Sequence, residues 1–201
     1  MPFDVESMSE INHRETEANM GKLVVTEYIS LDGVFEEPGE WSIPFFSDDA
    51  GEFKDQELFA SDAQLLGRLT YEGFARAWPT MEDAGDFGVR MNTMPKYVIS
   101  KTLENPDWEN TTVIRDDIAG KVAELKGKYQ GDILVAGSGQ LVRLLLEHDL
   151  VDEVRFMVHP LIVGEGKKLF SGEWAKKVFE LRETRPLESG IVLLFYVRKE
   201  G

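Results

Sequence analysis

The chain has 201 residues, 42% of them hydrophobic, and 37 acidic against 22 basic residues give it a net charge of −15. This acidity argues against a nucleic-acid partner, which needs a basic surface, and the absence of cysteine excludes disulfides and thiol catalysis. No apolar run approaches the length that crosses a bilayer and no secretory signal is visible, so we expect a cytoplasmic protein without a membrane partner.

Residues 1–20 differ from the rest of the chain. They contain few apolar residues and show no helical or strand period. Their acids are Asp4, Glu6, Glu10, Glu15 and Glu17. We predict a disordered tail over 1–20 and one folded domain over 21–201.

Strands and helices alternate in the first half of the predicted domain. Apolar patterns predict a strand over 23–29, a helix over 48–61, a strand over 63–66 and a helix from the turn at 67–70 to residue 78. Ser47 is a suitable cap for the first helix, and Asp48 and Asp49 suit the positive end of its dipole. The glycines in 79–92 predict a long loop.

The second half continues the alternation and then ends in strands. Strands are predicted over 96–100, 111–114, 133–136 and 153–158, and helices over 118–129 and 140–148. Residues 178–183 and 191–198 predict an antiparallel pair. The order of elements predicts an α/β fold: a mixed, mainly parallel sheet with helices on both faces and antiparallel C-terminal strands.

Turns that follow four of these strands carry small or polar residues. They cover 30–33, 67–70, 100–102 and 137–141. The carboxyl ends of parallel strands share one edge of a sheet, where ligands bind. Gly137-Ser138-Gly139 is the most informative, because a strand that enters a helix through small residues leaves N–H groups free for an anion. The alternative for each turn is a simple connection, and the three scattered histidines show no metal-ligand spacing.

Several segments together resemble the dihydrofolate reductase-like superfamily. They are Ser30-Leu31-Asp32-Gly33, Leu66-Gly67-Arg68-Leu69-Thr70-Tyr71-Glu72, Tyr97-Val98-Ile99-Ser100-Lys101, Gly137-Ser138-Gly139 and Asp152-Glu153. The stretch from His159 to Phe170 is typical of the group related to the reductase domain of bacterial riboflavin biosynthesis. The resemblance runs from about residue 22 to 198 and implies a three-layer dihydrofolate reductase-like fold, NADPH as cofactor and a homodimer.

The resemblance also implies cofactor contacts. The Gly-Arg-x-Thr turn and the next strand end would hold the adenosine half of NADPH and its 2′-phosphate through Gly67, Arg68, Thr70, Ser100 and Lys101. The later turn would hold the pyrophosphate through Gly137, Ser138, Gly139, Gln140 and Leu141. Dihydrofolate reductases carry a cis Gly-Gly pair at that turn. Because a cis bond before Ser138 is costly, the resemblance does not carry the same strained turn over to this chain.

Two acids are candidates for the chemistry. Asp32 follows the first strand and would lie near the nicotinamide, and Asp49 falls where dihydrofolate reductases place a buried acid. The alternatives are a turn aspartate and a helix cap. Trp41 resembles part of a substrate-binding loop, with packing on the sheet as the alternative. The predicted helix over 48–61 has only Lys54 where the riboflavin enzyme has arginines for a ribose phosphate.

These features predict an NADPH-dependent reductase that transfers hydride to a small heterocyclic or sugar-derived substrate. A pteridine or a compound like 5-amino-6-(5-phosphoribosylamino)uracil is the kind of substrate expected. The alternative is a catalytically silent nucleotide-binding protein with a regulatory or scaffold role, because a fold does not by itself assign a reaction.

Overall fold

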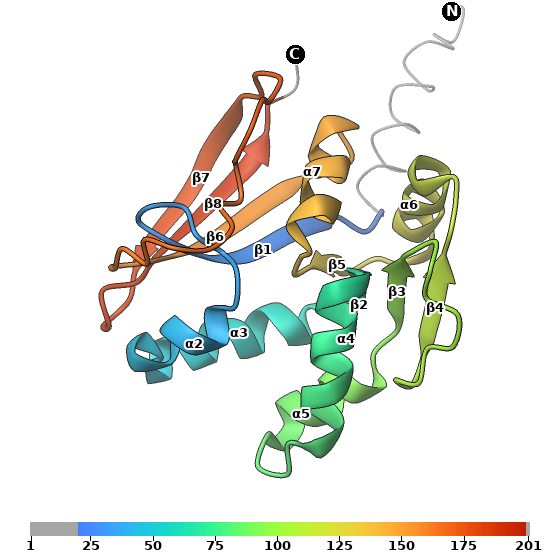
Figure 1. The fold of residues 1–201 in the computed structure, drawn as a ribbon, viewed down its shortest axis with the longest axis horizontal. Coiled ribbons are helices and arrows are strands. Elements are labelled where there is room, and N and C mark those ends of the chain that lie inside the picture. Colours follow the sequence, from blue (N-terminus) through green and yellow to red (C-terminus); the bar gives the residue numbers. More distant parts are fainter. Residues whose placement is uncertain (1–19, 200–201) are drawn as a thin grey trace, which may run out of the picture.

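One eight-stranded sheet runs through the computed structural model, which describes residues 20–199 (Figure 1). Its strand order is β4-β3-β2-β5-β1-β6-β8-β7. Neighbours from β4 to β6 pair in parallel, whereas β8 is antiparallel to β6 and β7 is antiparallel to β8. The strands are Leu23–Ser30 (β1), Ser61–Gly67 (β2), Lys96–Ile99 (β3), Thr111–Ile114 (β4), Asp132–Val135 (β5), Glu153–His159 (β6), Phe179–Pro186 (β7) and Val192–Arg198 (β8). The predicted sheet is confirmed.

Helices cover both faces of the sheet, as predicted. α6 and α7 pack on one face, and α3, α4 and α5 pack on the other (Figure 1). The helices are Pro38–Trp41 (α2), Asp48–Phe59 (α3), Arg68–Ala77 (α4), Gly85–Thr93 (α5), Ile118–Lys128 (α6) and Gly139–Glu147 (α7), with short 3-10 helices at Ile43–Phe45 (η1) and Trp78–Thr80 (η2). Within residues 20–199, none of these helices combines the length and apolar character that crossing a membrane requires.

The central strand β1 contributes to the core on both of its faces, because successive side chains of a strand point to opposite sides. Leu23 and Val25 pack with buried residues of α6 and α7, whereas Val24 packs with those of α4 and α5. Thr26 lies on the second face and donates from its hydroxyl to Glu57 of α3 (3.0 Å). Strands buried on both faces are typical of parallel sheets. Because β1 lies between β5 and β6 in the strand order, the turn after β1 lies near the middle of the edge at which the parallel strands end.

The predicted loop over 79–92 is wrong, because α5 occupies Gly85–Thr93. Glycine disfavours helices in general, but Gly85 begins this one with a φ of 53°. Gly88 packs so closely that an added Cβ would lie 2.5 Å from the Cβ of Ala84. Met91 is buried in the same cluster as Tyr71 of α4. Tertiary packing thus stabilises a helix that local propensity does not indicate. The short α2 and η1 were not predicted either.

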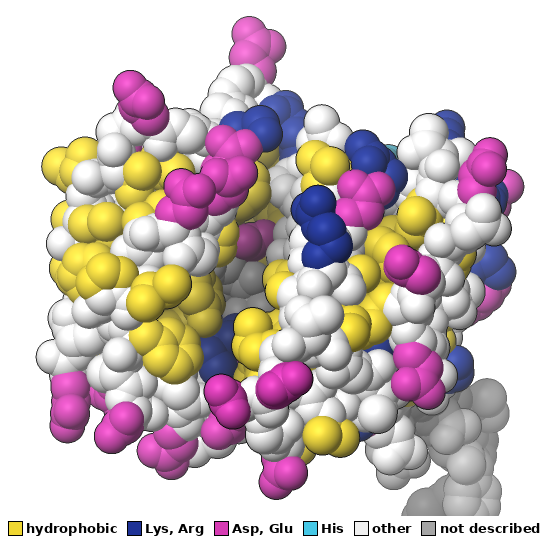
Figure 2. Space-filling model, turned by 60° about the horizontal axis from the view of Figure 1, so that its bottom comes forward, with side chains coloured by type: hydrophobic (Ala, Val, Ile, Leu, Met, Phe, Trp, Pro, Cys, Tyr) yellow, Lys and Arg dark blue, Asp and Glu magenta, His cyan; other side chains and the backbone are white. Residues whose placement is uncertain are grey.

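Hydrophobic side chains are exposed on the face that carries α2 to α5, with acidic side chains around them (Figure 2). The large exposed apolar residues of this part of the chain are Ile43, Phe46, Phe59, Leu69, Met81 and Val89. The predicted tail over 1–20, apart from Met20, lies outside the described residues.

Candidate functional site

The four predicted turns lie along one edge of the sheet, at the carboxyl ends of neighbouring strands. Gly67 at the end of β2 pairs in register with Ile99 of β3, and Val25 of β1 pairs with Val135 of β5. Because β2 also pairs with β5, the ends of β3, β2, β5 and β1 follow one another in that order. We call the resulting row of turns, 100–102, 67–70, 137–141 and 30–33, the carboxyl edge.

Two glycines hold the turns after β2 and β5 in direct contact. The Gly67 N–H donates to the carbonyl of Gly137 (3.0 Å). A Cβ at residue 67 would lie 2.4 Å from Ser138 Oγ, and a Cβ at residue 137, where φ is 98°, would lie 2.9 Å from Thr70 Oγ1. Glycine is therefore required at both positions. The Gly137–Ser138 peptide bond is cis. The turn thus has the cis geometry that the presence of Ser138 argued against.

The N-terminus of α7 opens onto the carboxyl edge. Its N-cap residue, Ser138, makes no side-chain capping hydrogen bond. The first N–H of the helix to be bonded within it belongs to Val142, which donates to the Ser138 carbonyl (3.0 Å). The N–H groups of 139–141 therefore lie at the positive end of the helix without helical acceptors. The side chain of Leu141 is buried in the core, so this residue offers a ligand only its backbone.

Cations follow the ends of β2, β3 and β4. The Arg68 side chain is 42% exposed and pairs with Glu72 (2.8 Å), and Lys101 is exposed in the turn after β3. Arg115 follows β4 and donates to the Leu103 carbonyl (2.8 Å). Arg115 was not predicted as a site residue, although a base directly after a strand was a visible signal. These three bases put positive charge at one end of the carboxyl edge of an acidic protein.

The two predicted hydroxyl contacts, Ser100 and Thr70, lie at different turns of the carboxyl edge. Ser100 Oγ accepts hydrogen bonds from the N–H groups of Thr102 (3.1 Å) and Leu103 (3.0 Å). The Ser100 hydroxyl thus stabilises its own turn. Thr70 lies against the Gly137 turn, where its Oγ1 would be 2.9 Å from a Cβ at residue 137.

Asp32 ties the turn after β1 to the loop after β6. Its carboxylate accepts from the Ser30 hydroxyl (2.7 Å) and from the N–H groups of Val163 and Gly164 (both 3.1 Å). These hydrogen bonds, chiefly the one from Ser30, lower the pKa of Asp32 to about 2. The predicted catalytic role of Asp32 therefore falls on a carboxylate that is ionised at neutral pH and already accepts three hydrogen bonds.

Removal of the Asp32 carboxylate is expected to loosen the loop after β6. In Asp32→Ala the Val163 and Gly164 amides lose their acceptor, and their hydrogen exchange should accelerate by roughly tenfold. Asp32→Asn keeps one acceptor oxygen and should accelerate exchange less. Exchange measured residue by residue by NMR checks this, with the amides of β6 as the internal reference. Unchanged exchange at both amides in Asp32→Ala would show that other contacts hold the loop.

Asp49 connects the start of α3 to the turn between β7 and β8. Its carboxylate accepts from the Ser47 hydroxyl and from the N–H of Glu188 (2.8 Å). These bonds, with that from Ser47 the strongest, lower the pKa of Asp49. The predicted catalytic role of Asp49 thus falls on a carboxylate that already has two donors and is ionised at neutral pH.

Trp41, the predicted substrate contact, belongs to an aromatic group around His159. Its ring meets the imidazole edge-on, with centroids 5.1 Å apart, and Tyr28 (5.2 Å) and Phe45 (6.1 Å) lie around the same imidazole. The His159 Nδ1 is hydrogen-bonded to a backbone carbonyl (2.9 Å), its buried Nε2 has no partner within residues 20–199, and desolvation lowers its pKa. A neutral histidine therefore lies at the end of β6, beside the end of β1.

Glu27 is a functional candidate that was not predicted. It lies in β1, is only 7% exposed, and its Oε1 has no hydrogen-bond partner in the described part of the chain. Desolvation raises the pKa of Glu27 to about 8, against the opposing effect of the Lys54 charge. An acid inside an otherwise apolar strand was the signal that could have identified it.

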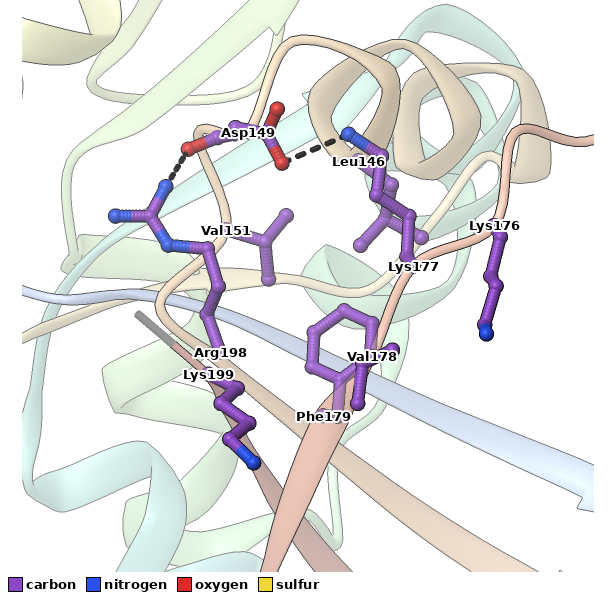
Figure 3. A pocket seen from close by; sticks show the side chains of 9 residues that line it. All are labelled: Leu146, Asp149, Val151, Lys176, Lys177, Val178, Phe179, Arg198 and Lys199. Atoms are coloured by element: carbon purple, nitrogen blue, oxygen red, sulfur yellow. Dashed lines mark hydrogen bonds and ion pairs between the residues drawn. The ribbon is translucent and has the colours of Figure 1, made fainter. Parts of the chain in front are cut away.

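A separate groove lies at the opposite edge of the sheet, where β7 begins and α7 ends (Figure 3). It encloses about 520 Å³ and is lined by Leu146, Asp149, Val151, Lys176, Lys177, Val178, Phe179, Arg198 and Lys199. Two of the basic side chains that line the groove are bound to Asp149. The Asp149 carboxylate pairs with Lys177 (2.7 Å), and the Asp149 carbonyl accepts a hydrogen bond from Arg198. None of the predicted site residues lines this groove.

Comparisons with known proteins agree with this fold. Residues 21–193 match the family model of the RibD C-terminal domain. The chain is 30% identical over 179 residues to the uncharacterized protein YyaP of Bacillus subtilis (strain 168). This match covers 87% of the chain and 94% of YyaP. Its fold is similar to that of a putative riboflavin biosynthesis protein from Shewanella sp. PV-4, with a TM-score of 0.71, 20% identity and coverage of 89% of this chain and 99% of the other.

A second solved structure is a dihydrofolate reductase from Enterococcus faecalis, complexed with NADP(H) and RAB-propyl. The TM-score is 0.61 at 21% identity, and the match covers 90% of this chain and 98% of the other. The dihydrofolate reductase-like fold expected from the sequence is therefore confirmed, and the chain belongs to the RibD C-terminal domain family.

Proposed function

We propose that the protein is an NADPH-dependent reductase that acts on a small heterocyclic or sugar-derived compound. The observation that carries this proposal is the contact between the turns after β2 and β5. There a Cβ at Gly67 or Gly137 would collide with Ser138 or Thr70, beside the free N–H groups that begin α7. Glycines that hold two backbones together at a helix N-terminus suit the close approach of a pyrophosphate.

The order of groups along the carboxyl edge suits a dinucleotide with one phosphorylated end. Arg68 and Lys101 lie at the ends of β2 and β3, so they would hold the 2′-phosphate of the adenosine. The N-terminus of α7, which follows β5, would hold the pyrophosphate. The nicotinamide would then extend toward β1, the next strand of the sheet.

Bound NADPH supplies the hydride that adds to a C=N or C=O carbon of the substrate. The chain would orient the two molecules and exclude water. Trp41, Tyr28 and Phe45 present apolar rings around His159 at the ends of β1 and β6, beside the expected position of the nicotinamide. These rings are suitable for stacking on a flat heterocycle.

The helix α3 disfavours a phosphorylated substrate on this side. Lys54 is its only base, and the ammonium group is already hydrogen-bonded to Glu57 and Thr26. Asp32 and Asp49 are held as ionised acceptors, so we assign them positioning roles. Water at the carboxyl edge is then the source of the proton that follows hydride transfer.

The alternative, a catalytically silent nucleotide-binding protein, is favoured by one observation. Both predicted catalytic acids, Asp32 and Asp49, already have two or more hydrogen-bond donors in loops and turns. This alternative predicts tight NADPH binding without turnover on any pteridine or pyrimidine.

Arg68→Ala is the variant that tests the cofactor assignment. If the guanidinium binds the 2′-phosphate, its loss should weaken NADPH binding by about tenfold to a hundredfold, because a charge-assisted hydrogen bond contributes about 1.5–3 kcal/mol. Binding of NADH, which lacks the phosphate, should stay the same within about twofold. Isothermal titration calorimetry with both nucleotides measures this difference.

Glu72→Gln is the matched control, since it removes the salt-bridge partner of Arg68 and leaves the guanidinium in place. This variant should bind NADPH at least as tightly as the unchanged protein. Binding of neither nucleotide to the unchanged protein would overturn the reductase proposal. Equal loss of NADPH and NADH binding in Arg68→Ala would overturn the role of Arg68 alone.

A further inference from the structure

Glu27 is the one buried acid whose carboxyl lies directly below the turn after β5, within the described residues. A Cβ at Gly137 would lie 3.6 Å from Glu27 Oε1 and 2.9 Å from Thr70 Oγ1. Oε1 has no hydrogen-bond partner in residues 20–199, although buried polar atoms nearly always have one. Oε1 itself is buried and the residue as a whole is 7% exposed, so the carboxyl lies just beneath the surface at this turn. An unpaired carboxyl at a glycine turn indicates a site completed by a bound molecule.

The position of Glu27 along the sheet suggests which part of a ligand reaches it. The carboxyl edge runs from β3 through β2 and β5 to β1. In the arrangement proposed above, the phosphate of the adenosine lies at Arg68 and Lys101 and the pyrophosphate at α7. The remaining part, the nicotinamide ring with its carboxamide, then lies over β1. Glu27 belongs to this strand and is paired in register with Phe156 of β6.

The surroundings of Glu27 keep its carboxyl protonated at neutral pH. Neighbouring elements contribute uncharged groups: Thr70 from α4, the Gly137 turn after β5 and Phe156 from β6. The charge that acts on it from α3 is Lys54, whose ammonium is paired with Glu57. Burial outweighs this charge and raises the pKa of Glu27 to about 8. The neutral carboxyl has both an O–H donor and a carbonyl acceptor.

We propose that Glu27, as the neutral acid, binds the carboxamide of the nicotinamide ring and so selects the amide form of the cofactor. Its O–H donates to the amide oxygen, and its carbonyl oxygen accepts from the amide NH₂. The inference rests on the proposed function, because it requires the dinucleotide to lie along the carboxyl edge. An ionised Glu27 loses the donor, and it repels a ring that carries a carboxylate in place of the amide.

Calorimetric titration of the full chain with three probes tests the proposal between pH 6.5 and 9. The probes are NADP⁺, its nicotinic acid analogue, and 2′-phospho-ADP-ribose, which lacks the ring. Affinity for NADP⁺ should fall by up to about tenfold over this range, because only the protonated fraction binds fully. Affinity for 2′-phospho-ADP-ribose should stay constant. At pH 9 the preference for NADP⁺ over the nicotinic acid analogue should be about tenfold or more.

Glu27→Gln keeps the shape and the hydrogen bonds of the neutral acid but does not titrate. Its NADP⁺ affinity should be constant across the range, and its preference against the nicotinic acid analogue should fall to within about twofold, since the glutamine NH₂ can donate to a carboxylate. Glu180→Gln, which removes one exposed charge on β7, is the matched control and should behave as the unchanged protein. The comparison of the three probes uses only the unchanged protein. It therefore tests whether the carboxamide is bound even if Glu27→Gln does not fold.

Two results would overturn the proposal in different ways. If the unchanged protein binds NADP⁺ and 2′-phospho-ADP-ribose with the same pH dependence and accepts the nicotinic acid analogue at pH 9, Glu27 does not bind the carboxamide and the reductase proposal stands. If none of the three probes binds, the proposed function fails and the role of Glu27 fails with it.

Discussion

Arg155→Met is expected to lower the free energy of unfolding by about 3–5 kcal/mol, because it leaves buried carboxylates without their cation. Arg155 lies in β6 with its side chain 15% exposed. Its guanidinium pairs with Glu153 (2.6 Å), with Asp132 of β5 (2.8 Å) and with Glu57 of α3 (3.4 Å). One side chain thus joins two strands and a helix. Glu57 keeps Lys54 as a partner after Arg155 is removed. Within residues 20–199, Asp132 and Glu153 pair with Arg155 alone, so these two acids lose their cation.

Urea denaturation followed by circular dichroism measures this loss. Arg182→Met, on the exposed strand β7, is the matched control and should change the free energy of unfolding by less than about 0.5 kcal/mol. The double variant Arg155→Met with Glu153→Gln also removes the charge of an acid that Arg155 had neutralised, and it should recover part of the loss. A similar small loss in Arg155→Met and Arg182→Met would show that water reaches the acids and that the network contributes little.

Glu27→Gln is expected to remove a pH-dependent loss of stability between about pH 4.5 and 8. The pKa of Glu27 rises from 4.5 to about 8 because burial disfavours the charged form. Between these values the unfolded chain is ionised while the folded protein keeps its proton, so the unfolded state binds fewer protons. The free energy of unfolding therefore falls as pH rises, by up to about 1.4 kcal/mol per pH unit, and levels off above pH 8.

The difference between the two proteins isolates this effect. His159, whose pKa is lowered by desolvation, makes both proteins less stable as pH falls below its unfolded value, and this contribution cancels in the comparison. Denaturation at pH 5, 6, 7 and 8 should show Glu27→Gln gaining stability relative to the unchanged protein at each step. Parallel curves would mean that Glu27 ionises in the folded protein much as it does in the unfolded chain.

The sheet was predictable because its central strands are buried on both faces and bounded by turn residues. Parallel strands share one edge, so the glycine turns at 67–70 and 137–141 could be brought together without a structure. The helix α5 was not predictable in the same way. Its glycines disfavour a helix locally, and what stabilises it is burial of Met91 against α4.

The roles of the acids depended on contacts between distant segments. Asp32 accepts from Gly164, 132 residues away, and Asp49 accepts from Glu188, 139 residues away. Neither partner can be identified from local spacing. Glu27 was missed because its burial depends on how β5, β6 and α4 pack around β1. The use of NADPH, the cytoplasmic location and the homodimer stay predictions.

The central position of β1 has a consequence for synthesis on the ribosome. β1 pairs with β5 and β6. Leu23 lies in register with Ile133, which is synthesised about 110 residues later. At a translation rate of about 5–20 residues per second, the apolar strand emerges roughly 5–20 seconds before its first partner. During that interval the segment Leu-Val-Val-Thr-Glu-Tyr-Ile-Ser is unpaired on both edges. The nascent chain therefore exposes an unpaired apolar strand early. β1 gains its first partner only when about two thirds of these 201 residues have been made, and β6 adds the second partner later.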